Sequence, residues 1–434
     1  MDSLPEELIL NIASNLIGHL WALSVTSRQL NRIANEVLYK DVDLPSNWST
    51  FRFLRTIIEN PTFATTESLV VSERRDDGSN EQRRTRWICR DLLRKYESLG
   101  STYIDLFAGD GNRDYSEKER KVCLMLLLSA LPRLRELHMT ESPNPFSLFH
   151  CFLPIRMLRA GVKDHFEHLK TLRLSTNSAN GVIDIRERDL LRIFQLPNLV
   201  TLVSTSPLMS SRALKMLQWP QRTSPIENIQ LIDTFVGDPV LTKMIGACRS
   251  LKTLVYQPQR QSGSDAEMPR TRISNFAGTL TSQSASLESL TVDVDEHLRD
   301  FPLGNLHDFN IREIQMPLLR QTFYCPALNT SINPHTRMEM KAEFHQGLLP
   351  RAMEKLVILR GGGYRVPALT CLSEPSARKW YPNLQSVVVH DKTTIFDDVD
   401  MKELEQVIGS FRGAGVEISF PVSQCKHRVL ERHG

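Results

Sequence analysis

Apolar residues recur at helical spacing through the first forty positions. Leu8, Ile12 and Leu16 repeat every four residues, which predicts one apolar stripe on a helix of about three turns. Residues 20–25 form a short apolar segment, and Ser27 then precedes a second stripe, for which its hydroxyl is a predicted N-cap. This stripe follows the spacing i, i+3, i+4, i+7 and i+8: Leu30, Ile33, Ala34, Val37 and Leu38. Three short helices are predicted, and a unit this small should lean on a partner or on the following domain.

A second pattern, apolar-x-x-apolar-x-apolar, recurs nine times along the rest of the chain, with a mean spacing of about 31 residues and with Ser204 at the last position of the third copy. Its copies begin at Leu134, Leu169, Leu199, Ile226, Leu251, Leu287, Ile311, Met353 and Leu384. Several copies follow a stretch of helical period that ends at a proline, such as residues 122–131 before Pro132. Because the residue before a proline disfavours helix, we predict that in these copies a helix ends at the proline and a strand follows it.

A helix–strand unit of this length cannot bury its apolar face alone, so stacked copies should share one core. We therefore expect an α/β protein in which a small three-helix unit (residues 1–44) precedes a solenoid with one curved parallel sheet (residues 45–420) and a tail (residues 421–434). Polar stretches at 72–86, 109–121, 257–274 and 329–346 should be loops between repeats. A generic α/β domain is the alternative, but no phosphate-binding glycine motif accompanies the strands.

Charge and composition narrow the classes of function. The chain has 53 Lys and Arg against 50 Asp and Glu, a formal net charge of +3, which disfavours nucleic acid and acidic membrane surfaces as partners. The longest apolar run, residues 122–128, is far shorter than the ~20 residues that span a bilayer. Seven cysteines without a Cys-x-x-Cys pair disfavour a disulfide framework. We expect a soluble protein of the cytoplasm or nucleus, without a membrane partner.

Residues that could carry catalysis or bind a metal are few. His165 and His168 have His-x-x-His spacing but no further cluster to complete a metal site. Gly361–Gly363 lacks the Lys-Ser/Thr of a phosphate-binding loop, and a turn explains it better. Cys123, Cys248 and Cys371 lie in apolar surroundings, where a thiol is inert. We expect no catalytic residue, no metal and no cofactor, and therefore no enzyme.

The amino-terminal pattern resembles the F-box. The matching residues are Leu4-Pro5-x-x-Leu8-x-x-x-Ile12-x-x-x-Leu16, Leu20-x-x-Leu23-Ser24-x-Thr26-Ser27-Arg28-x-Leu30-Asn31-x-Ile33-Ala34 and Leu38-Tyr39. The resemblance implies a three-helix module that docks on the Skp-type adaptor of a cullin–RING ubiquitin ligase. It also implies that Leu4, Pro5, Leu8 and Ile9 insert into the adaptor, while Ile12 and Leu16 face either the adaptor or the core of the module.

The remaining repeats look like a long, degenerate form of the leucine-rich repeat family. Together, the two resemblances imply the substrate-recognition subunit of a Skp–cullin–F-box ubiquitin ligase, which binds the adaptor at one end and an unidentified protein target through the repeats. The alternative is a ligase-independent protein-interaction scaffold with a vestigial or non-degradative F-box.

Side chains that alternate with the apolar anchors of each strand should point away from the core and are candidates for target binding. They include Glu136, His138, Arg173, Gln230, Thr253, Val255, Thr291 and Gln315. Recognition of a phosphorylated motif usually relies on several clustered arginines, and Arg173 is the one arginine of this set. We therefore expect the target to be recognised by shape and neutral hydrogen bonding, without obligatory phosphorylation. The alternative is that the polar loops bind the target.

Overall fold

The structure is a computed structural model of the 434-residue chain, and it forms two compact units, Met1–Gln218 and Trp219–Gly434. Each unit is described by itself. The residues that the structure describes are 4–16, 19–72, 123–124, 126–128, 130–141, 166–176, 183–184, 187–205, 208–209, 218–234, 236, 238–258, 276–293, 304–316, 349–359, 369, 372–373, 377–390 and 398–420.

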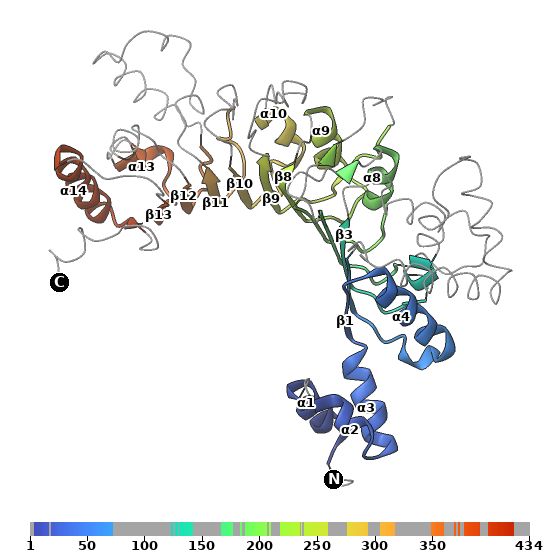
Figure 1. Ribbon diagram of the computed structural model, residues 1–434. Coiled ribbons are helices and arrows are strands. Elements are labelled where there is room, and N and C mark those ends of the chain that lie inside the picture. Colours follow the sequence, from blue (N-terminus) through green and yellow to red (C-terminus); the bar gives the residue numbers. More distant parts are fainter. Residues whose placement is uncertain are drawn as a thin grey trace. The chain divides into compact units, whose positions relative to one another are not determined.

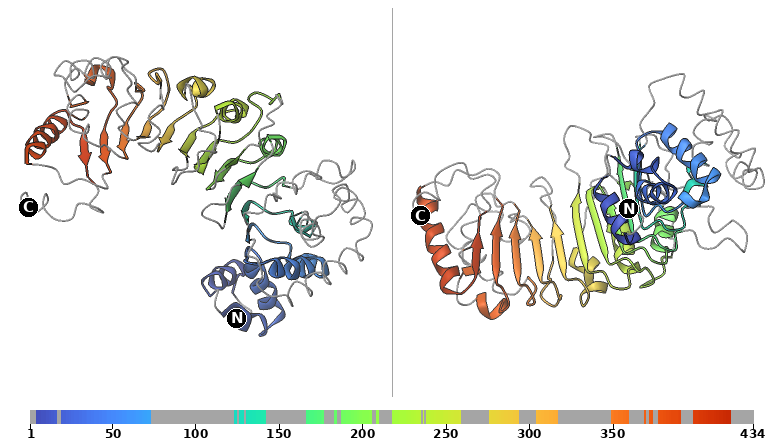
Figure 2. Two further views of the ribbon diagram at one scale, coloured as in Figure 1. Left: turned by 45° about the horizontal axis from the view of Figure 1, so that its top comes forward. Right: turned by 90° about the horizontal axis from the view of Figure 1, so that it is seen from below.

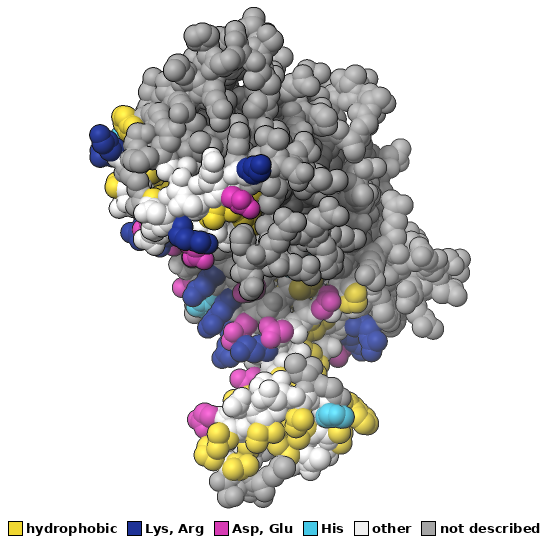
Figure 3. All heavy atoms as spheres, turned by 90° about the vertical axis from the view of Figure 1, so that its left-hand side faces the viewer, with side chains coloured by type: hydrophobic (Ala, Val, Ile, Leu, Met, Phe, Trp, Pro, Cys, Tyr) yellow, Lys and Arg dark blue, Asp and Glu magenta, His cyan; other side chains and the backbone are white. Residues whose placement is uncertain are grey.

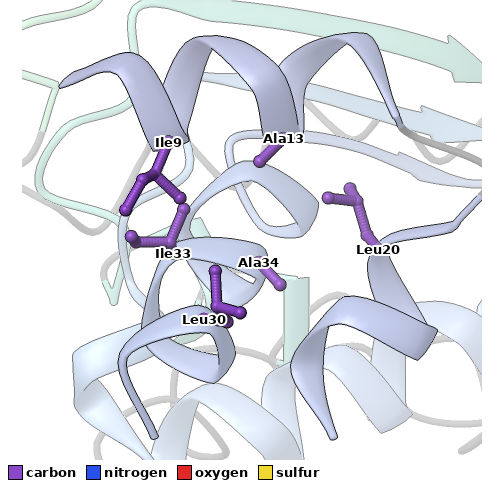
Figure 4. Packing of buried hydrophobic residues seen from close by; sticks show 6 residues of the cluster. All are labelled: Ile9, Ala13, Leu20, Leu30, Ile33 and Ala34. Carbon is purple, nitrogen blue, oxygen red and sulfur yellow. The ribbon is translucent and has the colours of Figure 1, made fainter. Parts of the chain in front are cut away.

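The first unit begins with a three-helix module: α1 (Glu6–Asn15), α2 (Leu20–Ser24) and α3 (Arg28–Leu38) (Figure 1). The predicted N-cap is confirmed, because the Ser27 hydroxyl accepts a hydrogen bond from the Leu30 N–H at 3.2 Å. Small and branched apolar side chains from all three helices meet in one core (Figure 4): Ile9, Ala13, Leu20, Leu30, Ile33 and Ala34.

A parallel sheet follows the module in the first unit. Its strands lie side by side in chain order: β1 (Asp41–Leu44), β2 (Ser68–Ser72), β3 (Glu136–Glu141), β4 (Thr171–Thr176) and β6 (Thr201–Ser204). Parallel neighbours need crossover connections, and the described helical elements in these connections include α4 (Asn47–Glu59), η2 (Pro61–Phe63) and α8 (Glu187–Phe194). Two short strands, β5 (Ile183–Asp184) and β7 (Leu208–Met209), pair separately.

The second unit repeats the same plan (Figure 2). Its parallel strands again lie in chain order: β8 (Asn228–Thr234), β9 (Thr253–Pro258), β10 (Ser289–Val292), β11 (Glu313–Met316), β12 (Lys355–Ile358), β13 (Ser386–Val389) and β14 (Glu417–Ser419). Its described helical elements include α9 (Asp238–Ala247), α10 (Phe276–Leu280), η4 (Thr281–Gln283), α13 (Ala377–Trp380) and α14 (Asp398–Gly413).

The predicted apolar pattern sets the register of the strands. The middle anchor of one copy pairs with the middle anchor of the next, as Leu137 does with Leu172 and Leu254 with Leu290. These side chains are at most 1% exposed. Each repeat therefore contributes one strand to a parallel sheet and the same positions to the core, as the sequence predicts for an α/β repeat protein.

The residue before most of the described strands carries a second repeated feature. Its carbonyl oxygen accepts two backbone N–H groups from the next copy: that of Glu227 binds the N–H groups of Lys252 and Thr253 at 2.8 and 3.0 Å. In the second unit the charges at this position alternate in sign over five copies, here called the charge ladder: Glu227, Lys252, Glu288, Arg312 and Glu354. The Lys252 Nζ lies 2.8 Å from a Glu227 carboxylate oxygen, and the Arg312 Nε lies 3.9 Å from one of Glu354.

The boundary between the three-helix module and the sheet lies before the predicted residue 44. Residues 41–44 are β1, which pairs with β2 from Asp41↔Ser68 to Leu44↔Val71. The module therefore ends near Leu38, because Asp41–Leu44 belongs to the sheet. At the other end, the helix α14 begins at Asp398, and β14 is the last described strand. Most of the predicted polar loops and the tail at 421–434 lie outside the described residues.

Candidate functional site

One row of apolar side chains lies exposed along α1. Leu4, Leu8, Ile12 and Leu16, the apolar row, are 40%, 50%, 48% and 39% exposed. Leu8 and Ile12 lie in α1, where residues four apart are neighbours on one side of the helix. Leu4 and Leu16 flank its two ends. Hydrophobic side chains gather on the three-helix module, lowest in Figure 3. An exposed apolar stripe of this kind is typical of a surface that binds another protein.

The opposite side of α1 faces the core of the module. Ile9 is 5% exposed and Ala13 is fully buried, and both side chains point toward α3 in Figure 4. The resemblance also assigns Ile9 to the adaptor, but its side chain fills the small core of the module. Ile12 and Leu16 were expected to face either the adaptor or the core of the module, and the structure places both side chains at the surface.

Backbone and charge contacts hold α1 in place. Pro5 precedes the helix and is exposed, and its carbonyl accepts the N–H groups of Leu8 and Ile9 at 3.1 and 3.2 Å. The Arg32 Nη2 lies 2.6 Å from the Glu6 Oε2 and ties the start of α1 to α3. The hydrogen bond from Glu6, followed by its charge, raises the pKa of Arg32. The core contacts of Ile9 and Ala13 set the orientation of α1, and this exposed pair adds to them.

Three further exposed side chains of the module escaped sequence reasoning as site residues. Trp21 is 77% exposed, Val25 is 68% exposed and Leu38 is 41% exposed. In α2, Leu20 is buried in the core and Leu23 packs against it, which leaves Trp21 and Val25, four positions apart, on another side. The four-residue spacing of Trp21 and Val25 was the sequence signal that could have identified this exposed side. Among the described residues, every other exposed large hydrophobic side chain except Trp380 belongs to the apolar row.

The predicted target-binding residues fall into two groups on the sheet. Glu136, His138 and Arg173 lie on the neighbouring strands β3 and β4 of the first unit. Glu136 and Arg173 are exposed, and His138 is half-buried. The other five lie on β8–β11 of the second unit, where all but Thr291 are half-buried: Gln230, Thr253, Val255, Thr291 and Gln315.

Thr291 is a correction to this set, because it is 8% exposed. Its register partners on the two neighbouring strands are Val255 and Gln315, and these larger side chains flank the short threonine. The Gln315 amide also donates to the Glu313 Oε1 at 3.0 Å, and the Lys355 Nζ donates to the same oxygen at 2.9 Å. The Gln315 amide is therefore already engaged within the sheet.

The His138 ring contacts one of two linked hydroxyl groups in the first unit. The Ser175 Oγ lies 3.0 Å from the His138 Nε2 and 3.0 Å from the Thr140 Oγ1. Burial lowers the pKa of His138, and the neighbouring Arg173 lowers it further, while Asp43 opposes the shift. The imidazole is therefore mainly neutral near pH 7, so that Arg173 supplies the positive charge of this part of the sheet.

No catalytic or metal-binding arrangement emerges within the part of the chain that the structure describes. No three side chains of the His, Cys, Asp and Glu types lie close enough there to hold a metal ion. Cys123 and Cys248 are buried, and burial raises the pKa of the Cys248 thiol to about 12. His165, Gly361–Gly363 and Cys371 lie outside the described residues. None of the described helices is long and apolar enough to cross a membrane.

No family model matches the chain, and a search of the curated proteins finds no match.

Proposed function

We propose that the chain is the substrate-recognition subunit of a Skp–cullin–F-box ubiquitin ligase. The observation that carries the proposal is the apolar row of α1, on a module whose small core is filled by other side chains. Together with the F-box-like sequence pattern, it supports an assignment of Leu4, Leu8, Ile12 and Leu16, with Pro5, to adaptor binding. Ile9 instead holds the helix from within.

The physical reason is that the apolar row is unfavourable in water. Burying apolar surface contributes roughly 25 cal/mol per Å², so a partner with an apolar groove would gain from covering these four side chains. The core contacts of Ile9 and Ala13, together with the Glu6–Arg32 pair, hold α1 against α3 before binding. Such preorganisation lowers the entropy that association costs.

The mechanism of this proposal is positioning. The module binds the adaptor, the repeats bind a protein target, and the assembled ligase holds a target lysine near a ubiquitin-charged conjugating enzyme. The rate of transfer rises because the effective concentration of the lysine rises. In this proposal no side chain of the chain takes part in bond chemistry.

Substitution of Leu4 and Leu8 by alanine tests the adaptor site. Buried apolar anchors commonly cost about 2 kcal/mol on truncation, so Leu4→Ala/Leu8→Ala should weaken binding to purified Skp-type adaptor by about thirtyfold or more. The exposed polar residue Asn11 on the same helix gives the matched control Asn11→Ala. Titration calorimetry measures the affinity, and unchanged affinity of the double variant would reject the adaptor site.

Assembly of the ligase is the second measurement. The proposal expects cullin to co-purify with the full-length chain through the adaptor and to be lost with Leu4→Ala/Leu8→Ala. If the adaptor binds but cullin never assembles, the chain is the ligase-independent scaffold that the sequence left as the alternative.

A further inference from the structure

We propose that the outward face of β1–β4, the face opposite the core anchors, binds an extended segment of a target protein that carries a basic and an acidic side chain four positions apart. The inference rests on the proposed function only in calling this partner a target. The binding itself requires no adaptor.

The register of the strands places four side chains in one line across this face. Asp43 pairs with Val70, Val70 with His138, and His138 with Arg173. The two ends of the line, Asp43 and Arg173, are exposed. Neighbouring strands lie about 4.8 Å apart, so three intervals separate the two charged ends by about 14 Å.

The two ends carry opposite charge. Asp41 and Glu136 lie one row away from Asp43 and His138 and are also exposed, which makes the β1–β3 end acidic. Arg173 is basic and stands on β4. Among the described residues, neither Asp43 nor Arg173 has an ion-pair partner within the chain, so both charges remain available to a ligand.

An extended segment fits this spacing. A strand rises about 3.4 Å per residue, so four residues cover nearly 14 Å, and residues four apart point to the same side. A helix needs about nine residues for the same distance. The residue midway between the two charges would lie over Val70 and the neutral imidazole of His138. The complementary segment therefore reads basic-x-apolar-x-acidic, in either chain direction.

Short labelled peptides in a Ser/Gly background test this pattern on the full-length chain. The matching peptide has a lysine, a valine two positions on, and a glutamate four positions on. Exposed ion pairs are weak and are screened by salt, so fluorescence anisotropy is measured at low ionic strength. The matching peptide should bind about fivefold or more tightly than peptides with two lysines, with two glutamates, or with the charges two positions apart.

Charge reversal then identifies the site. Arg173→Glu should shift the preference to the two-lysine peptide, and Asp43→Lys/Arg173→Glu should restore the preference for the mixed peptide. A misfolded variant loses binding but cannot acquire a new preference. Arg249→Glu makes the same charge change at an exposed position of the second unit and should leave the preference unaltered.

Two results would overturn the proposal: a wild-type chain that does not discriminate among the peptides, or Arg249→Glu acting like Arg173→Glu. The adaptor variant Leu4→Ala/Leu8→Ala should bind the matching peptide normally. A failure of adaptor binding and a failure of the charged face are therefore distinguishable.

Discussion

The side-chain amide of Gln283 connects successive copies of the repeat in the second unit. It is 2% exposed and uses both of its ends. Its Nε2 donates to the carbonyls of Ile245 and Cys248 at 3.0 and 2.8 Å. Its Oε1 accepts from the Leu251 N–H at 3.0 Å and from the Ser286 hydroxyl at 2.8 Å. A buried amide satisfied in this way closes the turn between α9 and β9.

Replacement of this amide should be costly. Gln283→Leu leaves the Cys248 carbonyl and the Leu251 N–H buried without partners, whereas the Ile245 carbonyl still accepts from the Cys248 N–H. Each unpartnered group costs about 1–3 kcal/mol. We expect the free energy of unfolding to fall by at least about 2 kcal/mol, measured by urea denaturation. Gln385→Leu, at an exposed glutamine before β13, is the matched control. Equal midpoints for the two variants would contradict the assigned role of Gln283.

His138 should make the stability of the first unit depend on pH. Burial and Arg173 lower its pKa in the folded state below the ordinary value of 6.5, against the opposing effect of Asp43. The unfolded chain therefore binds more protons than the folded chain in the interval between the two pKa values. The stabilising contribution is fully present above pH 6.5 and is lost as the pH falls through that value toward the lower, folded pKa.

Thermal unfolding at a series of pH values measures this dependence. His138→Gln should flatten part of the decline below pH 6.5, whereas His390→Gln, at an exposed histidine after β13, should leave it unchanged. If both variants decline in parallel with the natural sequence, His138 does not contribute.

At the scale of the elements, the charge ladder favours correct pairing of the strands. Each charge lies beside opposite charges from the adjacent copies, whereas a sheet that omitted one copy would set like charges side by side. Exposed ion pairs contribute little individually, but alternation over five consecutive copies acts against every such omission. The first unit shows the same sign pattern at Lys40, Glu67 and Arg135, with nitrogen–oxygen distances of 3.9 and 3.5 Å to Glu67.

Reversal of the central charge tests the ladder. Glu288→Lys places three cations on consecutive copies, between Lys252 and Arg312, and should lower the free energy of unfolding by about 1 kcal/mol at low salt. High salt should remove most of this difference because it screens exposed charges. Glu405→Lys, on α14, changes the net charge equally without touching the ladder. A loss that salt does not relieve would point to packing instead.

At the scale of the whole molecule, the position of β1 determines which deletion removes the module and leaves the sheet intact. Deletion of residues 1–38 removes α1–α3 but keeps Tyr39, whose ring stacks on Phe53 and Phe63 at 5.9 and 4.8 Å between centroids. Deletion of residues 1–44 also removes the Tyr39 ring, β1 and the buried Leu44.

The longer deletion should therefore be less stable. Burial of one leucine contributes about 2 kcal/mol, which corresponds to roughly 5 °C in the midpoint of thermal unfolding for a unit of this size. Calorimetry of the two truncated chains measures the difference. Identical midpoints would show that β1 adds nothing to the sheet and would restore the boundary at residue 44.

The sequence by itself determined the repeated features, because they depend on neighbouring positions in the chain. The spacing of Leu30, Ile33 and Ala34 identified the buried side of α3, and the Ser27 cap was readable from a single residue type. The apolar anchors identified the parallel strands, since one pattern of burial recurs in every copy. The same anchors fixed which side chains alternate away from the core.

Tertiary structure decided which of two apolar surfaces is buried. Ile9 and Leu8 are adjacent and equally apolar, yet Ile9 enters the core and Leu8 stays exposed, because α3 packs against one side of α1 only. Thr291 is hidden by the side chains of neighbouring strands, and Asp41–Leu44 became a strand because β2 offers it a partner. Asp43 and Arg173 are 130 positions apart in sequence and share one line across the sheet. Contacts between distant segments create these differences, and local periodicity carries no information about them.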